Sequence, residues 1–212
     1  MNDRQDLIDS LSADLAVVKP APSAARLALV WGVLSALYVM AVTHLFGPLR
    51  PTALQQLVSE PRFLGESLLG VMALAVAALI SFRAAIPGAL SRLLALTGGV
   101  LLALWLGAYL FGLISPALEP SMAGKRPHCF LETFLYALPP LFAGLLLVKR
   151  LYPLQPGRAG LWLGLTAGLL PALYMQLACM YIPDHILKFH IAPGLGVAAV
   201  AVPLGRWMLA RR

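Results

Sequence analysis

The chain has 212 residues, of which 60% are hydrophobic and only 12% are charged. Soluble domains contain about 45–50% apolar and about 25% charged residues, so this composition excludes an ordinary soluble domain and indicates a protein with several membrane spans. The net charge of +7 does not indicate nucleic-acid binding, because the basic residues are spread over the ends of loops instead of forming a patch.

Residues 1–23 form a polar segment without the features of a signal peptide. Apolar side chains recur at spacings of three and four residues, at Leu7, Ile8, Leu11, Leu15 and Val18. Aspartates lie before and between them, at Asp3, Asp6, Asp9 and Asp14. The pattern predicts a short amphipathic helix that ends at Lys19-Pro20.

This acidic helix has two interpretations. It is a surface helix lying on the membrane or on the protein's own loops, or it binds a partner. Helices that lie on membranes usually carry Lys and Arg on their polar face, so the aspartates favour a basic protein partner over a lipid surface.

Six apolar segments follow, each close to the ~20 residues that a helix needs to cross the hydrocarbon layer of a bilayer. They are residues Leu27 to Phe46, Phe63 to Phe82, Leu93 to Ser115, Phe130 to Val148, Leu161 to Tyr181, and Ile191 to Leu209. The sequence therefore predicts an all-α membrane protein with six transmembrane helices and short loops, in which residues 24–212 form the membrane domain and residues 1–23 form a separate tail.

The distribution of basic residues predicts the orientation of these spans. Eleven of the 16 lysines and arginines lie on the side of the two termini, and five lie on the other side. Because Lys and Arg near span ends favour the cytoplasmic side, we expect both termini in the cytoplasm. In a bacterium, the opposite side of the inner membrane faces the oxidising periplasm.

The two cysteines, Cys129 and Cys179, come at the start of the fourth span and the end of the fifth. The predicted topology brings both to the outer face. Three interpretations compete: two packing residues, a reversible disulfide, or a site for zinc or another soft transition-metal ion. The candidate metal ligands are His128, Cys129, Cys179, Asp184, His185 and His190.

Motifs of common enzymes are absent from the sequence, including the glycine-rich phosphate loop, the nucleophile elbow and the H-E-x-x-H zinc motif. We therefore do not expect an enzyme. The alternative is a small membrane thiol redox protein or a transporter that uses the same two cysteines, although the vicinal cysteine pair that thiol oxidoreductases generally need is missing.

The order of these features resembles the NrsF-type membrane anti-sigma factors over essentially the whole chain. The features are the tail from Leu7 to Leu15 ending in Val18-Lys19-Pro20, six spans, Cys129 at the fourth, and the stretch Cys179, Asp184, His190 before a Gly-rich last span. The resemblance implies that the tail, Asp6 to Val18, holds an extracytoplasmic-function sigma factor inactive. It also implies that Cys129 and Cys179 sense stress such as heavy metals or oxidants in the periplasm. The tail residues implied to bind are Leu7, Ile8, Leu11, Asp14, Leu15 and Val18.

Overall fold

The computed structural model describes residues 2–13 and 22–210, and helices make up nearly all of the secondary structure in that part of the chain. The elements are α1 (Asn2–Ala13), α2 (Ala24–Phe46), α3 (Ala53–Ser59), α4 (Pro61–Arg83), α5 (Arg92–Gly112), α6 (Cys129–Lys149), α7 (Pro156–Ala178), α8 (Pro183–Ile186), the π-helix η1 (Leu187–Ile191) and α9 (Ala192–Leu209). The all-α class is confirmed.

Six helices are long and apolar enough to cross a membrane: α2, α4, α5, α6, α7, and the continuous helix made by α8, η1 and α9. The six predicted spans are thus confirmed, with shifted boundaries. The largest shifts are at α7, which begins at Pro156 instead of Leu161, and at the last span, which begins at Pro183 instead of Ile191. Both helices start at a proline, which is favourable in the first turn because proline has no N–H to leave unpaired there.

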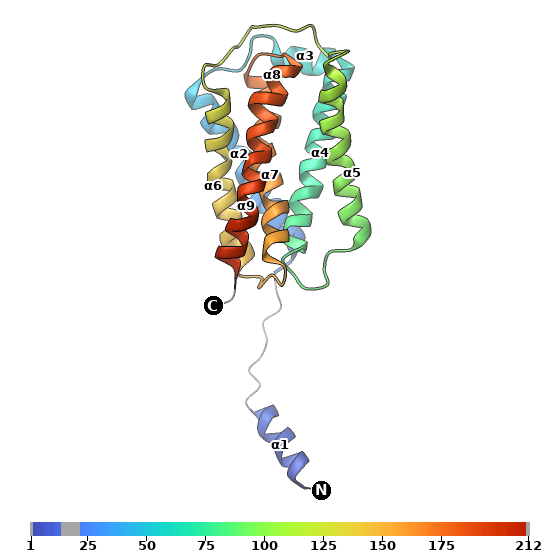
Figure 1. Cartoon of the computed structure of the whole chain (residues 1–212), viewed down its shortest axis with the longest axis vertical. Coiled ribbons are helices and arrows are strands. Elements are labelled where there is room, and N and C mark those ends of the chain that lie inside the picture. Colours follow the sequence, from blue (N-terminus) through green and yellow to red (C-terminus); the bar gives the residue numbers. More distant parts are fainter. Residues whose placement is uncertain (1, 14–21, 211–212) are drawn as a thin grey trace.

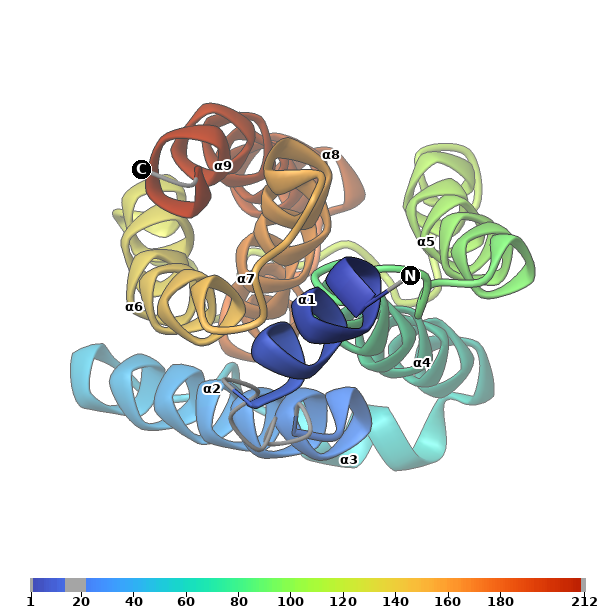
Figure 2. The same cartoon turned by 90° about the horizontal axis from the view of Figure 1, so that it is seen from below.

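Helix α7 lies at the centre of the bundle (Figures 1 and 2). It packs against α9 and α6 on one side, against α4 on the other, and against α2, while α5 packs on α4. The first residues of α2 and the last residues of α9 lie at one end of the bundle, which we call the terminal end (Figure 1). The start of α6 and the end of α7 lie at the opposite end, which we call the loop end.

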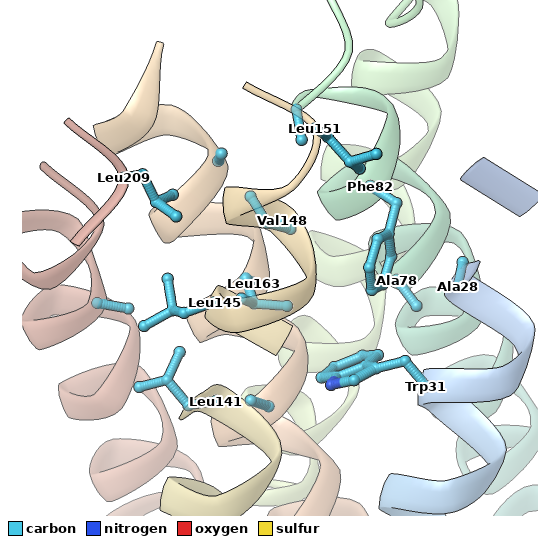
Figure 3. Packing of buried hydrophobic residues seen from close by; sticks show 14 of the residues in the cluster. Ala28, Trp31, Ala78, Phe82, Leu141, Leu145, Val148, Leu151, Leu163 and Leu209 are labelled. Carbon is cyan, nitrogen blue, oxygen red and sulfur yellow. The ribbon is translucent and has the colours of Figure 1, made fainter. Parts of the chain in front are cut away.

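A buried apolar cluster fills the bundle toward the terminal end and joins α2, α4, α6, α7 and α9 (Figure 3). Trp31 of α2 points into this cluster and meets Phe82 of α4 edge to face, with ring centroids 5.8 Å apart. Leu141 and Leu145 of α6 and Leu163 of α7 are fully buried there. This cluster connects α2 to the rest of the bundle.

The two ends of the bundle differ in charge. Among the described residues of the membrane domain, the terminal end carries only basic side chains, at Arg26, Arg83, Arg92, Lys149, Arg150, Arg158 and Arg206. The loop end carries both signs, and three ion pairs form there: Arg62 with Glu66, Arg126 with Glu132, and Lys188 with Asp184. The positive charge of the membrane domain is therefore concentrated at the terminal end.

The predicted tail helix is present as α1, and the described apolar side chains Leu7, Ile8 and Leu11 are exposed. Asp14, Leu15 and Val18 lie outside the described residues. The apolar stripe of α1 thus offers an uncovered surface.

The tightest helix packing in the bundle is between α7 and α9. A Cβ atom added at Gly168 would lie 2.2 Å from the backbone oxygen of Gly194, and one at Gly160 would lie 2.3 Å from that of Ala201. Small residues at these positions let the two backbones touch, as in other membrane helix pairs. A Cβ atom added at Gly164 would lie 2.4 Å from the Cβ of Ala201 and 2.8 Å from the Cα of Ala198.

We expect Gly168→Val to push α7 and α9 apart, because its Cβ would meet the Gly194 backbone and not a movable side chain. Overpacking of this kind typically costs about 1–3 kcal/mol. The measurement is the midpoint of thermal unfolding of the purified protein in detergent. Gly196→Ala in α9, where an added Cβ meets nothing within 4 Å, is the control. Equal midpoints for the two variants would contradict this account of the interface.

Candidate functional site

Two cysteines from different helices meet at the loop end. Cys129 is the first residue of α6, and Cys179 directly follows α7. Both are buried free thiols, and their sulfur atoms lie 2.9 Å apart. This separation is longer than the ~2.05 Å of a disulfide bond but short enough for a hydrogen bond between the thiols. The two cysteines therefore form one site.

Two histidines lie beside the two cysteines because the last span contains the π-helix η1. His185 and His190 are five residues apart, and in an α-helix such residues point about 140° away from each other, since each residue turns about 100°. The π-helix η1 widens the last span at this level, where hydrogen bonds run to the fifth residue instead of the fourth. The two imidazole rings consequently lie edge to face, with centroids 5.1 Å apart.

The donor atoms of Cys129, Cys179, His185 and His190 all lie within 4.8 Å of one another and could hold a metal ion. Donors around a tetrahedral zinc ion are about 3.3–3.8 Å apart, as its bond lengths require. Side-chain rotations that separate the two sulfur atoms, now 2.9 Å apart, and bring the histidines closer would give this arrangement. Two sulfur and two nitrogen donors also match the chemistry of zinc and other soft transition metals.

His190 adds a separate indication of a ligand. Its side chain is fully buried, and among the described residues neither ring nitrogen forms a hydrogen bond of good geometry, although the ring interacts with the Cys179 thiol. A buried polar group without a partner costs free energy that a bound ion would recover. His185 is half-buried, so it is the member of the group that solvent reaches.

The single thiol hydrogen of Cys129 faces two acceptors. These are Cys179 Sγ and the backbone oxygen of Arg126, which lies 3.3 Å from Cys129 Sγ. The hydrogen bond from Cys129 lowers the pKa of the Cys179 thiol, and this effect outweighs burial, which acts in the opposite direction. The lowered pKa favours the thiolate of Cys179, the form that reacts with oxidants and binds metals.

Arg50 places a positive charge beside the thiols. It is buried in the loop after α2, with its guanidinium carbon 5.9 Å from the centre of the Phe63 ring and 6.0 Å from that of Tyr181. It donates a hydrogen bond to Gln56, but its Nε and Nη2 atoms have no hydrogen-bond partner in the part of the chain that the structure describes. Burial lowers the pKa of Arg50, whereas negative charge on Tyr181 or Cys179 would raise it. A thiolate at Cys179 would therefore help to keep Arg50 charged.

The loop between α5 and α6 contacts the segment that follows Cys179. Ser121 forms an isolated antiparallel bridge with Tyr181, and the Tyr181 hydroxyl donates a hydrogen bond to Glu66 of α4. Burial, together with the charge of Glu66, raises the pKa of Tyr181 to about 12, so Tyr181 stays protonated and can donate. These contacts hold the segment after Cys179 in place.

The structure brings together four of the six candidate ligands predicted from the sequence. His128 is exposed at the N-cap of α6, outside the group. Asp184 is also exposed and pairs with Lys188, with oxygen and nitrogen 2.8 Å apart. His128 and Asp184 were predicted as ligands because they directly precede Cys129 and His185 in the sequence. Side chains one residue apart on a helix, however, point in different directions.

Sequence reasoning missed Arg126, which contacts the site through its backbone and α2 through its side chain. Its Nη1 atom donates to Glu132 Oε2 and its Nη2 atom donates to the backbone oxygen of Thr43, both at 2.9 Å. Its position three residues before Cys129 could have indicated a role at the site. Its charge, however, was interpreted only as evidence for the orientation of the spans.

Comparison with known protein families shows to which family the chain belongs. The family described as "Negative regulator of sigma F", NrsF, matches residues 11–210. The chain belongs to the NrsF family. No curated protein and no solved structure gives a significant match to it.

Membership of the NrsF family confirms the resemblance found in the sequence. The match extends from Leu11, in the last turn of α1, to the end of the last span, so it includes Cys129, Cys179, His185 and His190. The family description indicates negative regulation of a sigma factor, which makes a sigma factor the partner indicated for this NrsF protein.

Proposed function

We propose that this chain is an anti-sigma factor of the bacterial inner membrane and acts as a regulator, not as an enzyme. Its tail, residues 1–23, holds an extracytoplasmic-function sigma factor at the membrane, and a chemical change at Cys129 and Cys179 releases it. The observation that carries this proposal is the meeting of two buried thiols, in a family of negative sigma-factor regulators, at the end of the bundle opposite the tail.

The charge of the two ends supports the orientation that this function needs. The terminal end of the membrane domain carries basic side chains and no acidic ones among its described residues, which is typical of a cytoplasmic face. With that face in the cytoplasm, the tail meets the sigma factor and the cysteines meet the periplasm.

The exposed side chains of α1 support the role of the tail. Leu7, Ile8 and Leu11 form an uncovered apolar stripe flanked by Asp6 and Asp9. A partner with an apolar groove and a basic rim would bury the stripe and meet the aspartates. Sigma factors bind DNA through basic surfaces, so an acidic helix can compete for such a surface.

The site supports two kinds of signal. A two-electron oxidant such as a peroxide would join Cys129 and Cys179 in a disulfide, with the two thiol hydrogens and two electrons passing to the peroxide to give water. A soft metal ion would instead bind the two thiolates with His185 and His190, while the thiol protons pass to solvent. Both reactions remove the hydrogen that Cys129 now shares with Cys179 and the Arg126 carbonyl.

The tail is tested by co-purification of the full-length protein with a sigma factor. We expect Leu7→Asp combined with Leu11→Asp to lower the amount of bound sigma factor at least tenfold, because burial of one leucine contributes about 1.5–3 kcal/mol. Ala13→Asp, which adds a charge on the opposite side of α1, is the control. Wild-type protein that brings down no sigma factor would contradict the proposed function.

Sensing is tested with a sigma-dependent reporter in cells challenged with metal or peroxide. We expect Cys129→Ser, Cys179→Ser and the double variant to keep the reporter low and to abolish induction, since serine forms neither a disulfide nor a soft-metal bond. Protein levels in the membrane are measured in parallel. An undiminished response in the double variant would refute the sensing role of the cysteines.

Metal binding is tested by elemental analysis of the purified full-length protein after incubation with zinc and removal of excess ion. We expect about one zinc ion per chain, as in a single tetrahedral site, and loss of the ion in His190→Ala. His44→Ala is the matched control, because His44 bonds to Tyr174 and lies outside the four-residue group. Equal zinc content in the two variants would exclude His190 as a ligand.

A further inference from the structure

We propose that Arg126 is the positioning residue that couples the cysteine site to α2, the span that continues into the tail. This inference rests on the proposed function and adds the route by which a change at the thiols reaches the opposite side of the membrane. Arg126 is suited to this role because its backbone and its side chain bind different parts of the protein.

The backbone of Arg126 is bonded to the cysteine site. Its carbonyl oxygen accepts a hydrogen bond from Cys129 Sγ at 3.3 Å, and that thiol also lies 2.9 Å from Cys179 Sγ. A carbonyl can only accept, so it loses this donor when Cys129 gives up its hydrogen. Disulfide formation and metal binding therefore have the same effect on Arg126.

The side chain of Arg126 is bonded to α2. The guanidinium is buried, donates to the backbone oxygen of Thr43 near the end of α2, and is held in place by its ion pair with Glu132 of α6. Gly47, directly after α2, leaves the space that the guanidinium fills, since a Cβ there would lie 2.3 Å from Arg126 Nη2. Hydrogen bonds from a charged group are worth more than neutral ones, and here the bond joins the loop before α6 to α2.

A second contact joins α2 to α6 farther along the bundle. The indole nitrogen of Trp31 donates to the backbone oxygen of Pro140 at 3.0 Å, and Trp31 points from α2 into the cluster that contains Leu141 (Figure 3). α2 is therefore attached to α6 directly through Trp31, and indirectly through Arg126, which lies in the loop before α6 and pairs with Glu132 of α6. A displacement of α6 would therefore be passed to α2 at two levels.

On its other side α2 packs against α4 and α7, and His44 of α2 forms a hydrogen bond of 2.9 Å with the Tyr174 hydroxyl of α7. An apolar groove of about 640 Å³ lies between α2, α4 and α7, lined by residues such as Leu29, Leu68 and Leu173. Apolar contacts along a groove permit small displacements because they have no fixed geometry. Of the contacts that hold α2, those with Arg126 and with Pro140 of α6 are the ones that a change at the thiols can reach.

These contacts define two positions of α2, one for the reduced, metal-free site and one for the oxidised or metal-bound site. In the reduced, metal-free site Arg126 holds α2 in the position that keeps the sigma factor bound. When Cys129 forms a disulfide or a metal bond, the Arg126 carbonyl loses its donor, the guanidinium leaves Thr43, and α2 moves together with the tail.

Gly47→Ala tests the coupling without changing Arg126 or the thiols. Gly47 has an extended backbone that any residue adopts, with φ of 163°, and the clash falls on the end of a flexible side chain, so the variant should fold. We expect the unstressed sigma-dependent reporter to rise at least threefold and the induction ratio under peroxide to fall, while peroxide still protects both thiols from alkylation. Gly32→Ala, on α2 with nothing within 4 Å of its added Cβ, should behave as wild type.

Arg126→Lys provides a second test if Gly47→Ala fails to accumulate. Lysine keeps the charge beside Glu132 but lacks the fork that reaches Thr43 at the same time. Arg62→Lys, at an ion pair with Glu66 within α4, is its control. Reporter levels and induction equal to those of the controls would overturn the coupling. A wild-type protein that neither binds a sigma factor nor represses the reporter would instead refute the proposed function.

Discussion

The close contact between α7 and α9 is the constraint on which the rest of the structure depends. Backbone touches backbone where Gly168 meets Gly194 and where Gly160 meets Ala201, so neither helix can slide or rotate without a clash. The short connection after Cys179 then has one position available to it. This fixes the distance between Cys179, which follows α7, and His190, which lies in the same helix as α9.

The same contact explains why strained features persist at the loop end. A π-helix and a buried histidine that forms no hydrogen bond of good geometry with the described residues both cost free energy, and they persist only where surrounding packing holds them. Here the packing comes from the α7 and α9 pair, together with the bridge between Ser121 and Tyr181. A site arranged in this way is suited to recognition, because binding a ligand satisfies groups that the fold leaves unsatisfied.

The six spans could be predicted from the sequence because each is an apolar run close to the length that a bilayer requires. The meeting of Cys129 and Cys179 at one face also followed, since antiparallel neighbours bring the start of one span beside the end of the next. All four residues of the cluster were among the six candidate ligands, but the sequence could not show that His128 and Asp184 lie outside it. No sequence pattern marks the π-helix η1, which brings His190 to the cysteines. The contact of Arg126 with Thr43 joins residues 83 positions apart, so only the folded structure reveals it.

The burial of the thiols bears on how long a signal lasts. Cys129 and Cys179 lie beneath the surface, and only His185 is partly open to solvent. Small oxidants and ions can pass such an opening, whereas reduction of a disulfide requires a thiolate to attack one sulfur directly. Bulky reductants would therefore reach the oxidised pair slowly. Once switched, each molecule would stay switched, and the duration of the response would follow the replacement of the protein and not the removal of the oxidant.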